Sequence, residues 1–386
     1  MQEIGKALIS RIIQFAFLFS VLCSLCSTGL AQLEQVVRVV VIQEASTLNL
    51  KIKGSYEIID PASKKVLSRG SSLKTTVTTN KDKIFLAGEA FYADKILLKT
   101  HSIDQASING RVFRGDIELV KRGLALTAIN HIGLEDYIKG ISVREISHYW
   151  PSEALKVGVI AFRSFALYKM QENKFKDFDL TSDTYSQLYS GIAAERYRIN
   201  RAVDETKGLV LTYQGKILPA FYHATCAGHT EDASLIWNID IPPLKGVACD
   251  FCKYSPHFSW HYVLALDEMQ AQLAKVGYKP GKIESIGIAG LDASGRIIDL
   301  NIISSREPWK ISAKDFRNCL GANFIRSTNF TVSIDGSDAV FEGFGWGHGV
   351  GLCQWGAYFM AKSGKTFREI LRFYYPEAEI TLIDKS

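Results

Sequence analysis

Glu145 is the carboxylate whose sequence setting best suits acid chemistry. Leu134, Ile138, Ile141 and Glu145 follow one another at spacings of four, three and four residues, which places them on one face of a helix. Burial on an apolar face disfavours the ionised carboxylate and raises its pKa, so that a proton is available near neutral pH. General acid catalysis is one use of such a group.

Two structural explanations compete with acid chemistry for this glutamate. The carboxylate could be the buried ion-pair partner of Arg144 or Arg163, because ion pairs also perturb the pKa of buried acids. It could instead face water, if Gly140 ends the helix that carries it. A second helix is expected at Pro151, since proline is tolerated in the first helical turn. Glu145 would then lie at the junction of two helices.

The stretch SDTYSQLYSG carries polar and aromatic side chains at alternating positions. Tyr185, Gln187 and Tyr189 would share one side of an extended segment, since successive side chains of a strand point to opposite faces. Aromatic faces and an amide suit a groove that binds sugars. Packing of the two tyrosines in a core is the alternative.

A glycine-rich stretch, GFGWGHGVGLCQWG, contributes further candidates for this groove. Glycines let a backbone approach another backbone or a glycan closely. The side chains displayed around the turn would be Trp346, His348, Gln354 and Trp355, although a lone histidine is more often structural. No register of the glycines fits G-x-G-x-x-G, and the later SGKT lacks the preceding glycine of a phosphate-binding loop. A nucleotide is therefore not an expected ligand.

Two pairs of ligands have the spacing of a structural zinc site. The first pair is Cys226 and His229, and the second, after nineteen intervening residues, is Cys249 and Cys252. Four nitrogen and sulfur donors close a tetrahedral Zn²⁺ site and leave no open position for catalysis. We expect such a site to clamp the two loops together.

Other arrangements of these side chains are compatible with the spacing. An exported chain meets an oxidising environment, so Cys249 and Cys252 could form a disulfide, which would leave the other pair without a role. His223 is an alternative imidazole ligand. Cys319 and Cys353 are expected to be small buried apolar residues rather than functional thiols.

The composition bounds the class of protein. The chain has 386 residues, of which 47% are hydrophobic and 22% charged, and it is long enough for two core-forming units. Its formal net charge of +5 comes from intermixed basic and acidic residues, without a long basic run. We therefore expect no nucleic-acid partner, whereas an anionic polymer is compatible with this charge.

The N-terminal segment has the pattern of a secretory signal. A start with Lys6 and Arg11 precedes an apolar stretch, and Gly29, Leu30 and Ala31 then form a small-residue cleavage site. Such a signal would direct export of the chain, and cleavage after Ala31 would release the mature protein. An uncleaved membrane anchor is the alternative, although serines interrupt the run of roughly 20 apolar residues that a spanning helix needs.

The chain divides into two expected units. Short strand-like runs separated by turn residues fill the sequence from Val36 to about Leu98 and predict a small β-rich unit over residues 32–108. Two further strands, joined at residues 121–123, would lead into the first helix. We therefore expect an α+β protein, with a second unit over residues 109–386.

Four blocks between Asn109 and Pro376 form a larger pattern. They are LEDYIKGISVREISHYWPSEALKVGVIAFRSFALYK, SDTYSQLYSG, FYHATCAGHTEDASLIW and GFGWGHGVGLCQWGAYFMAKSGKTFREILRFYYP. In this order they resemble the stage II sporulation protein D family, which includes the LytB amidase enhancers. The resemblance implies a helical and β-rich core with a substrate groove, acting on the glycan strands of peptidoglycan.

The resemblance also implies activities and residue roles. Sporulation members resemble lytic transglycosylases that cut glycan strands lacking stem peptides, whereas other members enhance a partner cell-wall amidase. The family's catalytic acid precedes the Trp-Pro helix and matches Glu145. Many relatives continue with Met-Pro, where this chain has Ile146 and Ser147. Zinc-binding members use His and Cys in the block that contains Cys226.

Overall fold

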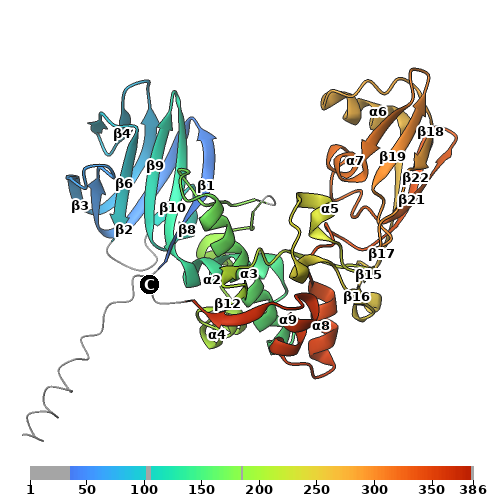
Figure 1. Ribbon diagram of the computed structural model, residues 1–386. Coiled ribbons are helices and arrows are strands. Elements are labelled where there is room, and N and C mark those ends of the chain that lie inside the picture. Colours follow the sequence, from blue (N-terminus) through green and yellow to red (C-terminus); the bar gives the residue numbers. More distant parts are fainter. Residues whose placement is uncertain (1–34, 101–105, 184–185, 384–386) are drawn as a thin grey trace, which may run out of the picture. The chain divides into compact units, whose positions relative to one another are not determined.

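The computed structural model describes residues 35–100, 106–183 and 186–383. Over these ranges the chain is an α+β protein, as expected, with a large β-sheet followed by helices and smaller sheets (Figure 1). The expected signal segment, residues 1–31, lies outside the described residues. No helix in the described part is long and apolar enough to cross a membrane.

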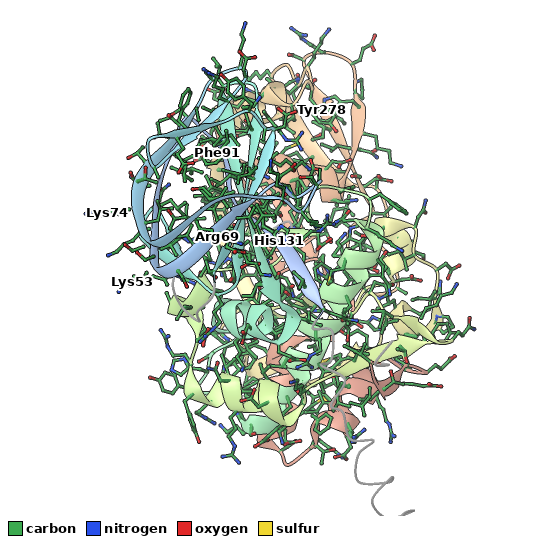
Figure 2. All side chains as sticks on the ribbon, turned by 90° about the vertical axis from the view of Figure 1, so that its left-hand side faces the viewer. Lys53, Arg69, Lys74, Phe91, His131 and Tyr278 are labelled. Atoms are coloured by element: carbon green, nitrogen blue, oxygen red, sulfur yellow. The ribbon has the colours of Figure 1, made fainter. Side chains whose placement is uncertain are left out.

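In the described part of the chain, the largest sheet has eleven strands. Its order is β11-β1-β10-β9-β6-β2-β3-β4-β5, and β7 pairs with β2 and β8. Apolar residues alternate with exposed ones along β2, where Leu48, Leu50 and Ile52 are buried. Lys53 of β2 and Lys74 of β3 face solvent (Figure 2). The strands are β1 (Val36–Ala45), β2 (Thr47–Ile59), β3 (Val66–Thr79), β4 (Ile84–Leu86), β5 (Glu89–Phe91), β6 (Lys95–Thr100), β7 (Ala106–Ile108), β8 (Arg111–Phe113), β9 (Asp116–Arg122), β10 (Ala125–Gly133) and β11 (Leu180–Thr181).

This sheet continues past residue 108. β9 pairs with β6, and β10 pairs with β1 from Val36 opposite Gly133 to Ala45 opposite Leu126. Strands from both sides of the division expected near residue 108 therefore form one sheet. The hairpin that joins β9 to β10 turns at Gly123, where φ is +64°, which agrees with the expected turn. No pattern within a short stretch of the sequence reveals that strands so distant along the chain pair with each other.

Helices α2 (Leu134–Glu145) and α3 (Ser152–Glu172) follow β10, as the periodicity predicts. Most of α3 is buried, and its side chains enter two cores. Leu155 and Val159 pack with the core of the large sheet, whereas Val157 and Ile160 pack with the core that includes α8 (Gln354–Lys362) and α9 (Phe367–Tyr374). An apolar helix of this kind is stable only when other elements cover it on several sides. α3 therefore joins the sheet to the C-terminal helices.

A third core, which the sequence patterns did not reveal, lies between Trp260 and Phe341. It includes two three-stranded sheets, ordered β17-β22-β21 and β18-β19-β20, with helices α6 and α7. Their bounds are β17 (Ser259–Ala265), α6 (Leu266–Lys275), β18 (Ile283–Ile288), β19 (Asp299–Ser304), β20 (Trp309–Ser312), α7 (Ala313–Leu320), β21 (Phe330–Asp335) and β22 (Asp338–Phe344).

Short elements connect these parts. β14 pairs in parallel with β23, and β15 pairs with β16, while β12 lies between β13 and β24. Their bounds are α4 (Tyr197–Glu205), β12 (Leu209–Tyr213), β13 (Lys216–Ile217), β14 (Tyr222–His223), β15 (Gly228–His229), α5 (Ala233–Trp237), β16 (Ala248–Cys249), β23 (Leu352–Cys353), α8 (Gln354–Lys362), α9 (Phe367–Tyr374) and β24 (Glu379–Leu382). Short 3₁₀ helices span Gly191–Ala194, Pro242–Leu244 and Phe251–Tyr254.

A buried ion pair ties α3 to α2. The side chain of Arg163 is 0% exposed, and its Nη2 lies 2.7 Å from Oε2 of Glu135. Removing one partner of such a pair leaves a buried charge uncompensated and typically costs about 3–5 kcal/mol. We expect Glu135→Ala to lower the free energy of unfolding by about 3 kcal/mol in chemical denaturation.

The exposed pair of Lys310 and Asp299 provides the control for this prediction. Its Nζ and Oδ2 atoms are 2.8 Å apart, but the lysine side chain is 57% exposed. Solvent screens such pairs, so Asp299→Ala should cost less than about 1 kcal/mol. Equal losses for the two variants would contradict a special role for the pair of Arg163 and Glu135.

Candidate functional site

A cavity of about 570 Å³ lies beside the C-terminal end of α2. Glu145, the last residue of α2, is part of its wall. The cavity is also lined by Phe165, Tyr168, Lys169 and Glu172 of α3, and by Ser186, Leu188, Phe221, Tyr222, Trp237, Ile239 and His348. Segments far apart in the sequence thus converge on the predicted acid.

The Glu145 side chain is half-buried in the cavity wall. This burial raises its pKa to about 7. Its Oε1 accepts a hydrogen bond from the backbone N–H of Leu188 at 3.1 Å, and the Tyr222 hydroxyl also hydrogen-bonds to the carboxyl. Both bonds favour the ionised form, but desolvation outweighs them. The carboxyl can therefore give up a proton and recover it near neutral pH.

Neither arginine proposed as an ion-pair partner binds the Glu145 carboxyl. Arg163 pairs with Glu135, and Nε of Arg144 donates to Oγ of Ser190 at 3.1 Å. Gly140 does not end α2, which continues to Glu145. Among the described residues, no cation forms an ion pair with the Glu145 carboxyl.

Gly140 has a packing role inside α2. A Cβ at this position would lie 2.5 Å from Cε2 of Tyr189, so only glycine lets that ring approach the helix. Tyr189 is 2% exposed, and its hydroxyl donates to Oδ1 of Asn130 at 2.8 Å. This tyrosine, predicted for the sugar groove, packs in the core and does not line the cavity, as the alternative interpretation allowed.

A chain of hydrogen bonds orients the Tyr222 hydroxyl. Oη of Tyr137 donates to Oε1 of Gln187 at 2.9 Å, and Nε2 of Gln187 donates to Oη of Tyr222 at 3.3 Å. Because the Tyr222 oxygen accepts from Gln187, its own hydrogen is free to be donated to Glu145. Gln187 is only 1% exposed, so it acts through Tyr222 and not on the cavity surface.

The C-terminal block contributes one cavity residue and one positioning residue. His348 lines the cavity, and burial together with the neighbouring His223 lowers its pKa far below the usual value, so the ring is neutral. Gln354 is buried at the start of α8, and its Nε2 donates to the backbone carbonyl of Glu145 at 3.0 Å. This bond fixes the end of α2 that carries the acid.

Trp346, another predicted groove residue, is not among the residues that line the cavity. Trp346 lies against Arg326, whose guanidinium carbon is 4.8 Å from the centre of the indole ring. The ring of His257 contacts Trp346 from another side, with centres 4.7 Å apart. Tyr185 lies outside the described residues.

The sequence patterns did not single out an aromatic part of the wall. Phe221 and Trp237 stack with ring centres 4.2 Å apart, and His348 meets Trp237 edge-on at 4.8 Å. Stacked aromatic faces of this kind are suitable for packing against sugar rings. The cavity residues Phe165, Tyr168 and Glu172 are spaced three and four residues apart on α3. This helical spacing was the available sequence signal for them, because such residues share a helix face.

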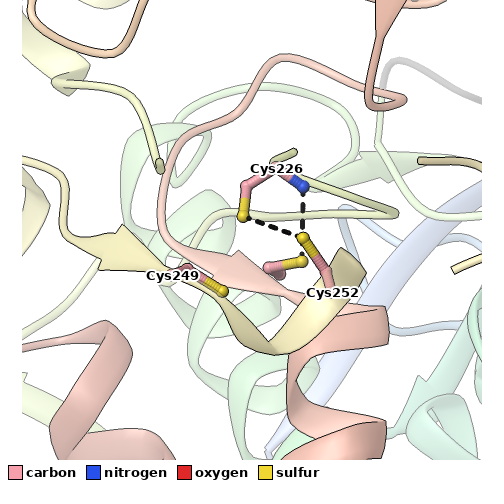
Figure 3. A group of neighbouring side chains, drawn as sticks. Cys226, Cys249 and Cys252 are labelled. Atoms are coloured by element: carbon pink, nitrogen blue, oxygen red, sulfur yellow. Dashed lines mark hydrogen bonds between the residues drawn. The ribbon is translucent and has the colours of Figure 1, made fainter. Parts of the chain in front are cut away.

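Four buried cysteines form a candidate metal centre (Figure 3). The Sγ atoms of Cys226, Cys249, Cys252 and Cys353 lie within 4.8 Å of one another, and those of Cys226 and Cys252 are 3.5 Å apart. Tetrahedral Zn²⁺ with sulfur at about 2.3 Å places its ligands about 3.8 Å apart, so this cluster has suitable dimensions. All four thiols are free, and Cys249 is not joined to Cys252 by a disulfide.

The fourth member of this cluster differs from the expected set. Cys353 takes the place predicted for His229, whose Nδ1 instead lies 2.6 Å from the carbonyl oxygen of Thr230. His223 is not part of the cluster either. Cys353 reaches the other cysteines because β23 pairs with β14, a contact between segments more than a hundred residues apart that the ligand spacing could not reveal.

Donor groups surround the sulfur atoms. The backbone N–H groups of Cys226 and Gly356 each donate to Sγ of Cys353 at 3.3 Å, and the Tyr374 hydroxyl lies 3.1 Å from Sγ of Cys249. Hydrogen bonds to sulfur stabilise the thiolate form that binds metal. The donor set therefore fits a closed structural metal site better than a catalytic one.

Comparison with known proteins identifies the family. The family described as Stage II sporulation protein matches residues 122–213, which include the acid-bearing helix. The Stage II sporulation protein D of Bacillus amyloliquefaciens is 28% identical over 272 residues, which cover 67% of this chain and 76% of that protein. The chain belongs to the stage II sporulation protein D family. The resemblance indicated by the sequence motifs is thus confirmed.

Further relatives of this sporulation protein D family member differ in length and description. An uncharacterized protein of Brachyspira hyodysenteriae is 30% identical over 349 residues, which cover 90% of this chain and 93% of that protein. The Amidase enhancer of Bacillus subtilis is 26% identical over 292 residues, which cover 63% of this chain and 40% of the enhancer. A domain of unknown function (DUF8618) matches residues 250–351, where the third core lies.

Proposed function

We propose that this chain is an exported peptidoglycan lytic transglycosylase with Glu145 as its single acid and base. The observation that carries the proposal is a carboxyl with a pKa of about 7 in the wall of a cavity large enough for sugar rings. Membership of a family with sporulation proteins and an amidase enhancer supports a substrate in the cell wall. The stacked rings of Phe221 and Trp237 offer a surface for a sugar face.

In the proposed reaction, the protonated Glu145 gives its proton to the glycosidic oxygen of the leaving sugar as the bond from C1 of N-acetylmuramic acid to that oxygen breaks. The carboxylate then takes the proton of the C6 hydroxyl of the same muramic acid, and the C6 oxygen bonds to C1. The product end is a 1,6-anhydro sugar, and Glu145 is protonated again. Ordinary glycosidases need two carboxylates, whereas here the substrate supplies the nucleophile.

The other carboxylate in the cavity wall is not suited to a second catalytic role. Both oxygens of Glu172 are engaged, since Oε1 accepts from the Tyr168 hydroxyl at 2.8 Å and Oε2 accepts from Nζ of Lys169 at 2.7 Å. These donors hold the pKa of Glu172 below its usual value, although partial burial opposes them. A one-acid mechanism is therefore the simplest that fits this cavity.

The test is a digestion of purified glycan strands, with and without stem peptides, followed by mass spectrometry of the new ends. Appearance of 1,6-anhydro-N-acetylmuramic acid, most of all from strands without peptides, is the expected result. Intact strands, or strands with reducing ends, would exclude a lytic transglycosylase.

The similarity to an amidase enhancer favours one alternative. In that role the chain would bind glycan without cutting it and stimulate a partner cell-wall amidase. Retention of strands on the protein without cleavage, together with faster release of peptides by an added amidase, would support the enhancer.

Zinc is the proposed cofactor of the cysteine cluster. Cys226, Cys249, Cys252 and Cys353 would hold it as thiolates, and its contribution would be structural, because four protein ligands leave no position for substrate. Such an ion would fix the start of α8, whose first residue, Gln354, bonds to the backbone of Glu145.

The proposed acid role predicts a pH dependence with a definite sign. The protonated Glu145 starts each turnover, and its pKa of about 7 means that the protonated fraction falls tenfold per pH unit well above that value. We expect kcat/KM for glycan cleavage to be level below about pH 6 and to fall with a slope of −1 above about pH 8. A profile that stays flat up to pH 9, in a pH range where the fold is intact by circular dichroism, would contradict the role.

A further inference from the structure

The cavity contains an ion pair that the proposed acid chemistry does not use. Tyr168, Lys169 and Glu172 lie on the last turns of α3 and line the same cavity as Glu145. The side chain of Lys169 is 28% exposed, and that of Glu172 is 41% exposed. Both charged groups can therefore be reached by a molecule that enters the cavity.

The charged groups of Glu172 and Lys169 differ in how many of their hydrogen bonds are made within the protein. Glu172 already accepts one hydrogen bond on each oxygen, from Tyr168 and from Lys169. The ammonium of Lys169 has three N–H donors, and among the described residues only Glu172 accepts from it. Two N–H donors of Lys169 are thus available to a ligand, whereas each oxygen of the Glu172 carboxylate already accepts a hydrogen bond.

The surroundings of Lys169 strengthen its attraction for an anion. The centres of the Phe165 and Tyr168 rings each lie 5.9 Å from its Nζ, so apolar surface replaces part of the water around the ammonium. His348, the other nitrogen base in the wall, is neutral because burial lowers its pKa. Lys169 is therefore the cation that the lining residues offer to a ligand.

We propose that Lys169 binds the carboxylate of an acidic sugar and gives the cavity its preference for muramic acid over neutral N-acetylglucosamine polymers. The inference rests on the proposed function, because it takes the ligand to be a glycan strand. N-acetylmuramic acid carries a lactyl carboxylate, which is free and ionised when no peptide is attached. A charge-assisted hydrogen bond from Lys169 to this group discriminates against a strand in which the carboxylate is absent or amidated.

The test compares two ligands that differ only at the carboxyl group. Peptide-free glycan strands and the same strands reduced to the lactyl alcohol are titrated into full-length mature protein carrying Glu145→Gln, so that cleavage does not disturb the measurement. We expect the acidic strands to bind about tenfold more tightly, a difference that shrinks at high salt. Addition of Lys169→Met should abolish the preference by weakening only the acidic strands, and Lys169→Arg should preserve it.

Lys174→Met is the matched control. Lys174 is an exposed lysine just beyond α3 that does not line the cavity, so its loss should leave the preference intact. An unchanged preference in Lys169→Met, or an equal loss of affinity for both strands, would overturn the inference. Failure of the proposed function looks different: strands would bind with a Lys169-dependent preference, but wild-type protein would produce no anhydro ends.

Discussion

Glu145→Gln should abolish glycan cleavage while the protein stays folded and still binds glycan. The amide keeps the shape of the side chain, and its oxygen can still accept the hydrogen bond from the Leu188 N–H, but it cannot deliver or recover a proton. General acid–base groups contribute about 10²- to 10⁴-fold to rate, so the loss should far exceed assay error. Release of anhydro-ended fragments, with thermal unfolding measured in parallel, gives the comparison.

Asp136→Asn is the control for this variant. Asp136 is on the same helix, but its side chain is 38% exposed and it does not line the cavity. Its substitution should leave cleavage near the wild-type rate. Because Arg163 pairs with Glu135 and not with Glu145, the Glu145→Gln protein should not melt much earlier than wild type. Near-wild-type activity of Glu145→Gln would exclude the proposed acid.

Cys353→Ser should remove the metal and destabilise the protein, whereas His229→Ala should do neither. The sulfur of Cys353 is within the cluster, and the imidazole of His229 is not. Binding free energies of structural zinc are about 10–16 kcal/mol in small domains, and this energy is part of folding, so losing one of four ligands should cost several kcal/mol. Elemental analysis should find about one zinc per wild-type chain and much less in the variant.

Cys319→Ser serves as the control, since Cys319 is a free, half-buried cysteine outside the cluster. It should retain the metal and the wild-type melting temperature. Zinc retained by Cys353→Ser but lost from His229→Ala would reverse the ligand assignment, and wild-type protein without metal would refute the site.

Metal loss should also reduce cleavage, although the cluster holds no catalytic residue. Cys353 is followed by Gln354, whose side chain holds the backbone carbonyl of Glu145. A loosened start of α8 would therefore let the end of α2 move, and misplaced catalytic groups lose rate steeply. A Cys353→Ser protein that remains folded at low temperature is expected to show lower kcat.

Local sequence patterns were sufficient to predict much of the structure around Glu145. The spacing of Leu134, Ile138, Ile141 and Glu145 was sufficient to predict α2 and to place the carboxyl on its apolar side, because a helix converts sequence spacing directly into a shared face. The strand-like runs likewise predicted the β-rich N-terminal part. The two-residue gap between Cys249 and Cys252 predicted half of the cysteine cluster for the same reason, because residues close in sequence also lie close in space.

Only the tertiary structure decided which distant segments meet these local features. Parallel pairing of β23 with β14 brings Cys353 into the cluster, and the packing of α8 brings Gln354 to the backbone of Glu145. The cavity wall of Phe221, Trp237 and Lys169 arises in the same way. Such contacts depend on the cooperative burial of whole cores, and the free energy of that burial belongs to many residues at once, so no short stretch of the sequence records it.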